Sequence, residues 1–360
     1  MSSPWTRWIP AALVPVVAVA GVVLVPMAAD ATPTLPEKSP EQVLEFIAGS
    51  ADAQYSGTVE QDSELGLPDL SSLGSGYGGD GATGSAISAA LELLTGANSA
   101  RVFVGGPDTS RIQVTDTLAE RVVIRNGAEA WTYDSESNAV QHVPAAGSAR
   151  PDTGVTETPA EVATKLIAAI DSSTSVTVTD TARVAGRPVY QLVLTPTDDA
   201  TLVGSVILSV DSESGLPLDV RIFAAGQTDP AFSVGFSSID FGTPDASLFT
   251  FTPPAGATVD ESTVDSDNSG TKPKNDDKAG PEVYGTGWSS IVELPAGSAT
   301  DGGATDTGDS ATSGLLDQVL TPVSDGRALE TSLVSVLLTT DGRVFVGAVS
   351  LDQLQAAAAQ

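Results

Sequence analysis

Few side chains in this sequence have the type and spacing that catalysis or metal binding requires. His142 is the single histidine, so a hydrolytic triad or a zinc site built on imidazole would have to use it. It alternates with Val140 and Val143 on a predicted strand, which favours a surface or cross-strand role. There is no GxSxG serine motif, and no two carboxylates can be paired for acid-base work. We therefore expect no catalytic residues and no enzyme activity; a hydrolase that depends on His142 is the weakest alternative.

Two loops match ligand-binding patterns only in part. Residues 74–79 (GSGYGG) fit GxGxxG, but no strand directly precedes them and no acidic ribose ligand follows on a second parallel strand. Residues 265–276 space their oxygen ligands as a calcium loop does, but Pro273 interrupts them, flanking helices are absent, and Asp276 replaces the usual glutamate. We interpret the first as a flexible loop and the second as a solvated acidic segment, and predict no cofactor and no metal.

Composition excludes several classes of protein. There are no cysteines, which rules out thiol nucleophiles, disulfides, thiolate metal sites and a lipid-modified N-terminal cysteine. The formal net charge is -30, with 46 acidic against 16 basic side chains, so phosphate backbones and anionic membrane surfaces are repelled. Nucleic acid is therefore not expected as a partner.

The N-terminal residues 1–31 have the form of an export signal. Arg7 precedes an apolar run over residues 9–29, and Ala29-Asp30-Ala31 has the small-x-small form of a cleavage site. An uncleaved anchor is the alternative, since the run is nearly long enough to span a bilayer. Both interpretations place the rest of the chain outside the cytoplasm.

Three helices are predicted before the linker. Ser39 can cap the first, with Pro40 at its first position and Gln42 completing a capping box. Ile87, Leu91 and Leu94 form the apolar stripe of a short helix at 86–94, which follows a Gly-rich loop at 71–85 and could act as a mobile lid. The third helix runs from about 159 to 170, and Thr158 is its plausible cap.

Short segments rich in valine, isoleucine and aromatic residues alternate with turn signals, of which Asn126-Gly127 is the strongest hairpin mark. The fold class is mainly β with α (α+β): a curled, half-open antiparallel barrel of about ten to eleven strands, with helices covering its mouth. Residues 32–257 would form this barrel domain, residues 258–282 an acidic disordered linker, and residues 283–360 a small C-terminal α+β domain with a disordered insert at 296–313.

The apolar side of this sheet is the candidate ligand site. An acyl chain gains about 0.8 kcal/mol for each CH₂ that it buries, and a half-closed barrel can hold such a tail; an ordinary packed core is the alternative. The predicted cavity and lid residues are Tyr55, Val59, Ile87, Leu91, Leu94, Val102, Val104, Ile112, Val114, Val122, Ile124, Trp131 and Tyr133.

Several short motifs, in this order and spacing, resemble the LolA-like superfamily over residues 40 to 258. These are SGTV at 56–59, NG at 126–127 with WTYD at 131–134, GRPVYQL at 186–192 and SGLPL at 214–218. FTFTPP at 249–254 looks like the closing strand of that family. The Gly-rich loop and the acidic linker look like actinobacterial-type versions.

The resemblance implies a half-open barrel whose helices gate a hydrophobic cavity, and carriage of lipoprotein acyl chains or lipids within the cell envelope. RseB/MucB-type envelope-stress regulators share this domain and add a smaller C-terminal domain, so a regulatory or sensor module that binds a membrane protein is the alternative. The implied partners are lipoprotein acyl chains or lipids, and a membrane-embedded donor or regulatory protein. We expect a monomer.

Overall fold

The computed structural model describes residues 35–66, 98–115, 119–144, 158–261, 282–294 and 320–360. The predicted signal at 1–31, the loop-helix unit at 71–94 and the calcium-like segment at 265–276 lie outside the described residues, as does the insert at 296–313. Among the described residues, no helix is long and apolar enough to cross a membrane.

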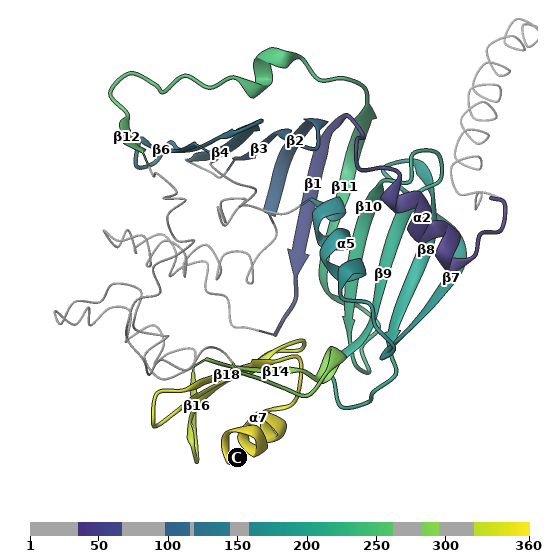
Figure 1. Cartoon of the computed structure of the whole chain (residues 1–360), viewed down its shortest axis with the longest axis vertical. Coiled ribbons are helices and arrows are strands. Elements are labelled where there is room, and N and C mark those ends of the chain that lie inside the picture. Colours follow the sequence, from purple (N-terminus) through teal and green to yellow (C-terminus); the bar gives the residue numbers. More distant parts are fainter. Residues whose placement is uncertain (1–34, 67–97, 116–118, 145–157, 262–281, 295–319) are drawn as a thin grey trace, which may run out of the picture.

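One large curled sheet dominates the described chain, and it does not close into a barrel (Figure 1). Its twelve strands have the spatial order β12-β6-β5-β4-β3-β2-β1-β11-β10-β9-β8-β7. Their bounds are β1 Tyr55–Ser63, β2 Asn98–Gly106, β3 Thr109–Thr115, β4 Glu120–Asn126, β5 Glu129–Asp134, β6 Ala139–Pro144, β7 Thr174–Val184, β8 Arg187–Pro196, β9 Val203–Asp211, β10 Pro217–Ala224, β11 Pro230–Phe241 and β12 Thr258–Glu261. Two meanders, β2 to β6 and β7 to β11, meet at β1, which pairs antiparallel with β2 and β11. A mainly β, curled sheet was therefore predicted correctly.

The last strand differs from the sequence-based expectation. β12 pairs parallel with β6, from Thr258 opposite Ala139 to Glu261 opposite His142. Composition placed residues 258–261 at the start of the linker, because Val259 is their single large apolar residue and the other three are polar or acidic. Backbone pairing with an open sheet edge makes them a strand instead. The remaining linker residues 262–281 lie outside the described part of the chain.

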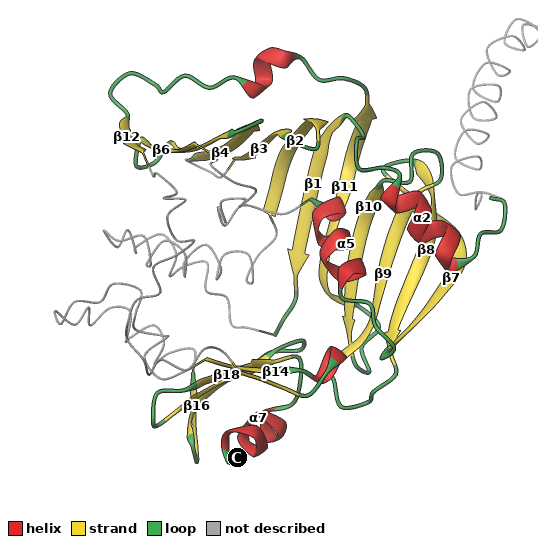
Figure 2. Cartoon of the chain, viewed as in Figure 1, coloured by secondary structure: helices red, strands yellow, loops and turns green. Residues whose placement is uncertain are grey.

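Two capped helices lie on the concave face of β7 to β11 (Figures 1 and 2). In α2 (Pro40–Ala48) the Ser39 side chain accepts from the Gln42 backbone N–H, and the Gln42 side chain accepts from the Ser39 N–H, as predicted. Thr158 and Glu161 form the same capping box on α5 (Pro159–Ala168). Each box satisfies two N–H groups that the first helical turn would leave without partners.

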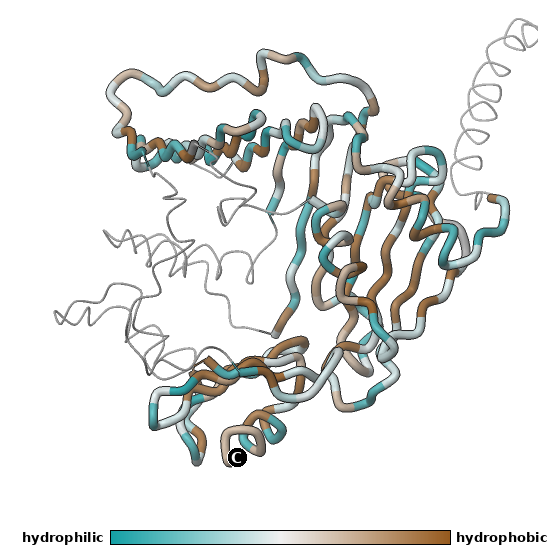
Figure 3. The backbone as a smooth tube through the Cα atoms, in the orientation of Figure 1, coloured by the Kyte–Doolittle hydropathy of each residue, from teal (hydrophilic) through white to brown (hydrophobic). Residues whose placement is uncertain are grey.

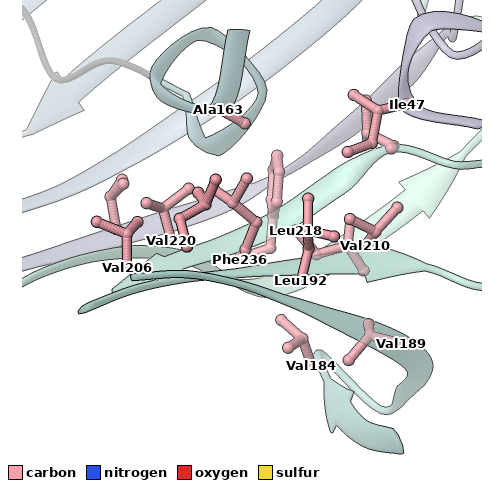
Figure 4. Close-up of a cluster of buried hydrophobic side chains, with 14 of the residues drawn as sticks. Ile47, Ala163, Val184, Val189, Leu192, Val206, Val210, Leu218, Val220 and Phe236 are labelled. Atoms are coloured by element: carbon pink, nitrogen blue, oxygen red, sulfur yellow. The ribbon is translucent and has the colours of Figure 1, made fainter. Parts of the chain in front are cut away.

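The main hydrophobic core lies between these helices and the sheet (Figures 3 and 4). Ala163 of α5 lies over Val206 and Val220, and Ile47 of α2 lies over Leu218. All five side chains are 8% exposed or less. Burying a valine, leucine or isoleucine side chain contributes about 1.5–3 kcal/mol, so this half of the sheet supplies most of the hydrophobic stabilisation.

A second sheet has the spatial order β13-β14-β18-β17-β16-β15 and carries one helix. Its elements are β13 Glu282–Tyr284, β14 Ile291–Leu294, β15 Thr321–Val323, β16 Gly326–Glu330, β17 Ser335–Thr339, β18 Val344–Gly347 and α7 Leu351–Ala358. Leu337 and Phe345 on the sheet pack with Leu354 of α7, and all three are fully buried. A 3-10 turn at Gly287–Ser289 separates β13 from β14.

The elements of the second sheet contact the large sheet and its loops at several places, and one of these contacts is the hydrogen bond that Trp288 Nε1 donates to Thr174 Oγ1 of β7 at 2.8 Å. Thr201 and Val349 form a β-bridge, and the Leu202 N–H donates to the Ala348 carbonyl at 2.7 Å. Beyond the end of β1, the Ser332 N–H donates to the Leu65 carbonyl at 3.0 Å, and Leu333 joins the main core. The domain boundaries stay a prediction, and these contacts tie residues 320–360 to the curled sheet.

A buried carboxylate organises the turn between β9 and β10. Asp211 is 0% exposed, and the Arg187 side chain donates to it through Nε at 2.6 Å and Nη2 at 3.1 Å. The Ser214 N–H donates to its second oxygen at 2.8 Å, which shapes the turn that leads to Gly215. Gly215 has φ +75°, and a Cβ there would lie 2.3 Å from the carbonyl oxygen of Phe46 in α2.

Gly215→Ala should lower the free energy of unfolding by about 2–3 kcal/mol, because positive φ strain and a backbone clash with α2 act together. Urea unfolding followed by circular dichroism measures this. Gly226→Ala is the matched control: its φ is +77° but nothing lies within 4 Å of the added Cβ. Equal losses in the two variants would show that α2 does not rest on this turn.

The same carboxylate should make stability depend on acidic pH. Burial opposes ionisation of Asp211, but hydrogen bonds from Arg187 and Ser214 outweigh it and hold its pKa below the usual value. A group whose pKa is lower in the folded state stabilises the protein above its unfolded pKa of about 3.9, and this stabilisation is lost as the pH falls through the folded value.

We expect Asp211→Asn to lower the free energy of unfolding by about 3 kcal/mol at pH 7, because it leaves Arg187 without its buried partner. Between pH 5 and pH 3 the free energy of unfolding of this variant should fall by less than that of the wild type. Urea unfolding at pH 7, 5 and 3 measures both differences. Glu213→Gln is the control, since Glu213 also binds Arg187, at 2.8 Å, but has a 75% exposed side chain and should change stability by less than about 1 kcal/mol. A wild-type-like acid response in Asp211→Asn would contradict the assignment.

Candidate functional site

Six of the predicted cavity residues share one face of β1 to β3, which we call the inner strip. Strand register places them together: Tyr55 lies opposite Val104, and Val102 opposite Ile112. The inner strip consists of Tyr55, Val59, Val102, Val104, Ile112 and Val114. Because Val59 lies opposite the core residue Phe236 of β11, this is also the face that the helices cover.

Most of the inner strip is already buried. Val59 is 0% and Val102 1% exposed, so both are fully packed in the core. Val104 and Ile112 are half-buried at the border of that core. On α5, Leu166 and Ile167 are half-buried in the same way. The core therefore has an incompletely covered apolar border, with members on the sheet and on the helix.

The other four described residues of the prediction lie on the opposite face of the sheet. Ile112 is paired with Val123, whereas Val122 lies opposite Gln113, so the face changes between the predicted members of β3 and β4. Trp131 and Tyr133 lie opposite Ile124 and Val122 and share their face. The structure thus separates Val122, Ile124, Trp131 and Tyr133 from the inner strip. Ile87, Leu91 and Leu94 lie outside the described residues.

The chain itself covers this opposite face. Phe251 lies 5.6 Å from Trp131 and 6.0 Å from Tyr133 between ring centroids, and Phe249 is 5% exposed. Phe249 ends a short 3-10 helix, η3 (Ala246–Phe249), and Arg111 donates to the Leu248 carbonyl at 3.3 Å. We call Val122, Ile124, Trp131, Tyr133, Phe249 and Phe251 the outer aromatic cluster.

This cluster corrects one expectation. FTFTPP at 249–254 is not the closing strand, because Phe249 and Phe251 use their side chains to cover the sheet, and two prolines leave no N–H at 253 and 254. β12 closes the edge a few residues later.

His142 belongs to the same face. Its ring stacks on Trp131 with centroids 3.7 Å apart and planes 9° apart, and its Nε2 lies 3.6 Å from a carboxylate oxygen of Glu129. A ring stacked in this way supports packing across β5 and β6, the cross-strand role that the alternation favoured. Within the described residues, no three His, Asp or Glu side chains gather as a metal site would require.

A depression of about 420 Å³ lies beside α2, and sequence reasoning did not indicate it. Its lining residues are Lys38, Gln42, Glu45, Phe46, Gly49 and Ser214. The ammonium group of Lys38 sits 4.9 Å from the Phe46 ring centroid and 5.7 Å from that of Tyr190. Its walls are mixed polar and apolar, so it fits a hydrocarbon chain less well than the apolar border of the core does.

A family model described as "Predicted periplasmic protein (DUF2092)" matches residues 83–260, and no curated protein matches the sequence. The solved structure of the Pseudomonas aeruginosa MucA/MucB complex is similar at 15% identity and a TM-score of 0.45, covering 89% of this chain and 96% of that chain. A LolA superfamily protein from Nitrosomonas europaea is similar at 11% identity and a TM-score of 0.23, covering 60% and 99%. The predicted resemblance to the LolA-like superfamily is confirmed as a resemblance.

Phe249→Ala should lower the free energy of unfolding by about 3 kcal/mol, because it empties the outer aromatic cluster and releases the segment that leads to β12. Chemical unfolding of the two proteins side by side measures this. Val259→Ala is the control, since Val259 on β12 is 44% exposed and should cost less than about 0.5 kcal/mol. A Phe249 variant as stable as this control would contradict closure of the outer face.

Proposed function

We propose that this chain binds acyl chains of lipids or lipoproteins outside the cytoplasm and moves them within the cell envelope without catalysing a reaction. The observation that carries the proposal is the incompletely covered apolar border of the core, with Val104 and Ile112 on the sheet and Leu166 and Ile167 on α5. A hydrocarbon tail needs apolar surface and no hydrogen-bond partner, so such a border suits it. The leader and the periplasmic description of the matched family support the location.

The way in which α5 packs on the sheet supports a gating role for this helix. Its fully buried side chains are Pro159 and Ala163, and its larger apolar side chains Val162, Leu166 and Ile167 pack against the core while only half-buried. Movement of α5 would uncover the core beneath it, where Val206 and Val220 lie under Ala163 (Figure 4). A tail that entered there would replace part of the helix contact and would gain about 0.8 kcal/mol per buried CH₂.

A regulatory module that binds a membrane protein is the second candidate. Contact of the second sheet with both β1 and the β8–β9 end of the large sheet favours it, because a ligand on the concave side could then change what the second sheet presents. The similar solved structures include a complex of MucB with MucA. In this candidate the acyl chain is a signal and not a cargo.

Ile167→Gln should weaken binding of a fluorescent acyl probe by about tenfold, because it places an amide on the apolar border of α5. Titration of residues 32–360 measures this, together with native mass spectrometry and lipid extraction of protein from a membrane-containing host. Ala168→Gln is the matched control, since Ala168 is the next residue of α5 and is exposed.

If the purified wild-type protein carries no lipid and does not bind acyl probes, lipid binding is contradicted. The second candidate, a protein-binding module, would then remain. Equal weakening by the variants at 167 and 168 would show that binding does not use this side of α5.

A further inference from the structure

The second sheet presents a regular array of aliphatic side chains on the face opposite α7. Register on β14, β18 and β17 aligns them in two rows of three: the first is Val292, Val346 and Val336, and the second is Leu294, Val344 and Leu338. Residues two apart on a strand lie about 6.7 Å apart, and neighbouring strands about 4.8 Å. We call these six residues the aliphatic grid; it is roughly 10 Å by 7 Å.

The grid takes no part in the cores that the described residues form. The second sheet builds its own core on the α7 side, where Leu337 and Phe345 are 0% exposed. All six grid residues are half-buried, and none is among the residues packed against either hydrophobic core of the described chain. The sheet therefore does not need the grid for the core that it shares with α7.

The docking of the second sheet turns the grid toward the concave side of the large sheet. α7 packs on the far face of β17 and β18, as Figure 1 shows below the sheet. The sheet is fixed by the Thr201–Val349 bridge and by the Ser332–Leu65 hydrogen bond at the end of β1. Figure 3 shows that the strands of this sheet are largely apolar.

We infer that the aliphatic grid is a second wall of the acyl-binding site and that it selects for long tails; this rests on the proposed function. Its chemistry suits hydrocarbon, because the six side chains of the grid carry no hydrogen-bond donor, acceptor or charge. On β16 the row through Leu338 ends at Arg327, so a charge borders the grid at that edge. Protein-binding surfaces concentrate binding energy in Trp, Tyr and Arg, and none of the six grid residues is of these types. Short tails would be held by the border at α5 and by Val104 and Ile112 of the inner strip, and only longer tails would reach the grid.

The test is a series of acyl probes from 8 to 18 carbons, titrated against residues 32–360. Affinity of the wild type should rise by about fourfold per CH₂ along the series, the factor that corresponds to 0.8 kcal/mol. Val336→Thr with Val346→Thr keeps side-chain shape but adds two hydroxyls to the grid. This variant should bind the 18-carbon probe at least tenfold more weakly and the 8-carbon probe within twofold of the wild type. Val259→Thr, on the exposed side chain of β12, should leave the whole series unchanged.

A photoreactive group at the tail end gives a readout that needs no variant. The 18-carbon probe should label peptides from β14, β17 and β18 in the wild type, and the 8-carbon probe should not. If the double variant binds the series with the same length dependence as the wild type, or if labelling is confined to the large sheet, the grid is not part of the acyl-binding site. In that case the proposed function still stands as long as Ile167→Gln weakens binding. Absence of any acyl binding by the wild type overturns both. Should the double variant unfold, Val346→Thr alone and the labelling pattern decide between these outcomes.

Discussion

A buried carboxylate, Asp211, is the constraint on which the helix-covered half of the large sheet depends. A charge that is 0% exposed is tolerated only when partners replace water, and here Arg187 and the turn at Ser214 do so. The Arg187 guanidinium also lies 4.7 Å above the Phe241 ring at the end of β11. The hairpins of β8 to β11 are thereby tied at one corner, and the turn that follows Asp211 gives α2 its seat.

The two meanders are consequently covered in opposite ways. On β7 to β11 the helices α2 and α5 cover the concave face and create the main core. On β2 to β6 the segment after β11 crosses to the other face and covers it with Phe249 and Phe251. Described segments thus cover the two meanders on opposite faces. The proposed ligand site rests on the concave side, where half-buried apolar residues of β2, β3 and α5 border the main core.

Local sequence signals predicted local structure well. Which face of each strand points inward was harder to predict. Both capping-box helices and the Asn126-Gly127 turn follow from side-chain chemistry within a few residues. β4 carries Val122, Val123 and Ile124 in succession, so it is apolar on both faces and its inward side cannot be read from alternation. β12 was missed because tertiary pairing, and not composition, makes it a strand. β17 and β18 are likewise apolar on both faces, with Leu337 and Phe345 between the grid residues of their strands, so only tertiary docking shows which way the grid faces.

Because most of the inner strip is buried, the second sheet matters as a further surface for a ligand. Val59 and Val102 are too well packed to meet a ligand in the described arrangement, so the proposed acyl binding would have to use the border at α5, surfaces beyond it, or a movement of α5. A second sheet held by bridges and hydrogen bonds supplies such a surface at a fixed distance. A carrier and a regulator would then share one binding event and differ in its consequence. In a carrier the second sheet would hold the tail until it is transferred; in a regulator, occupation of the grid would alter the contacts at Leu65 and Thr201 and so the surface offered to a partner.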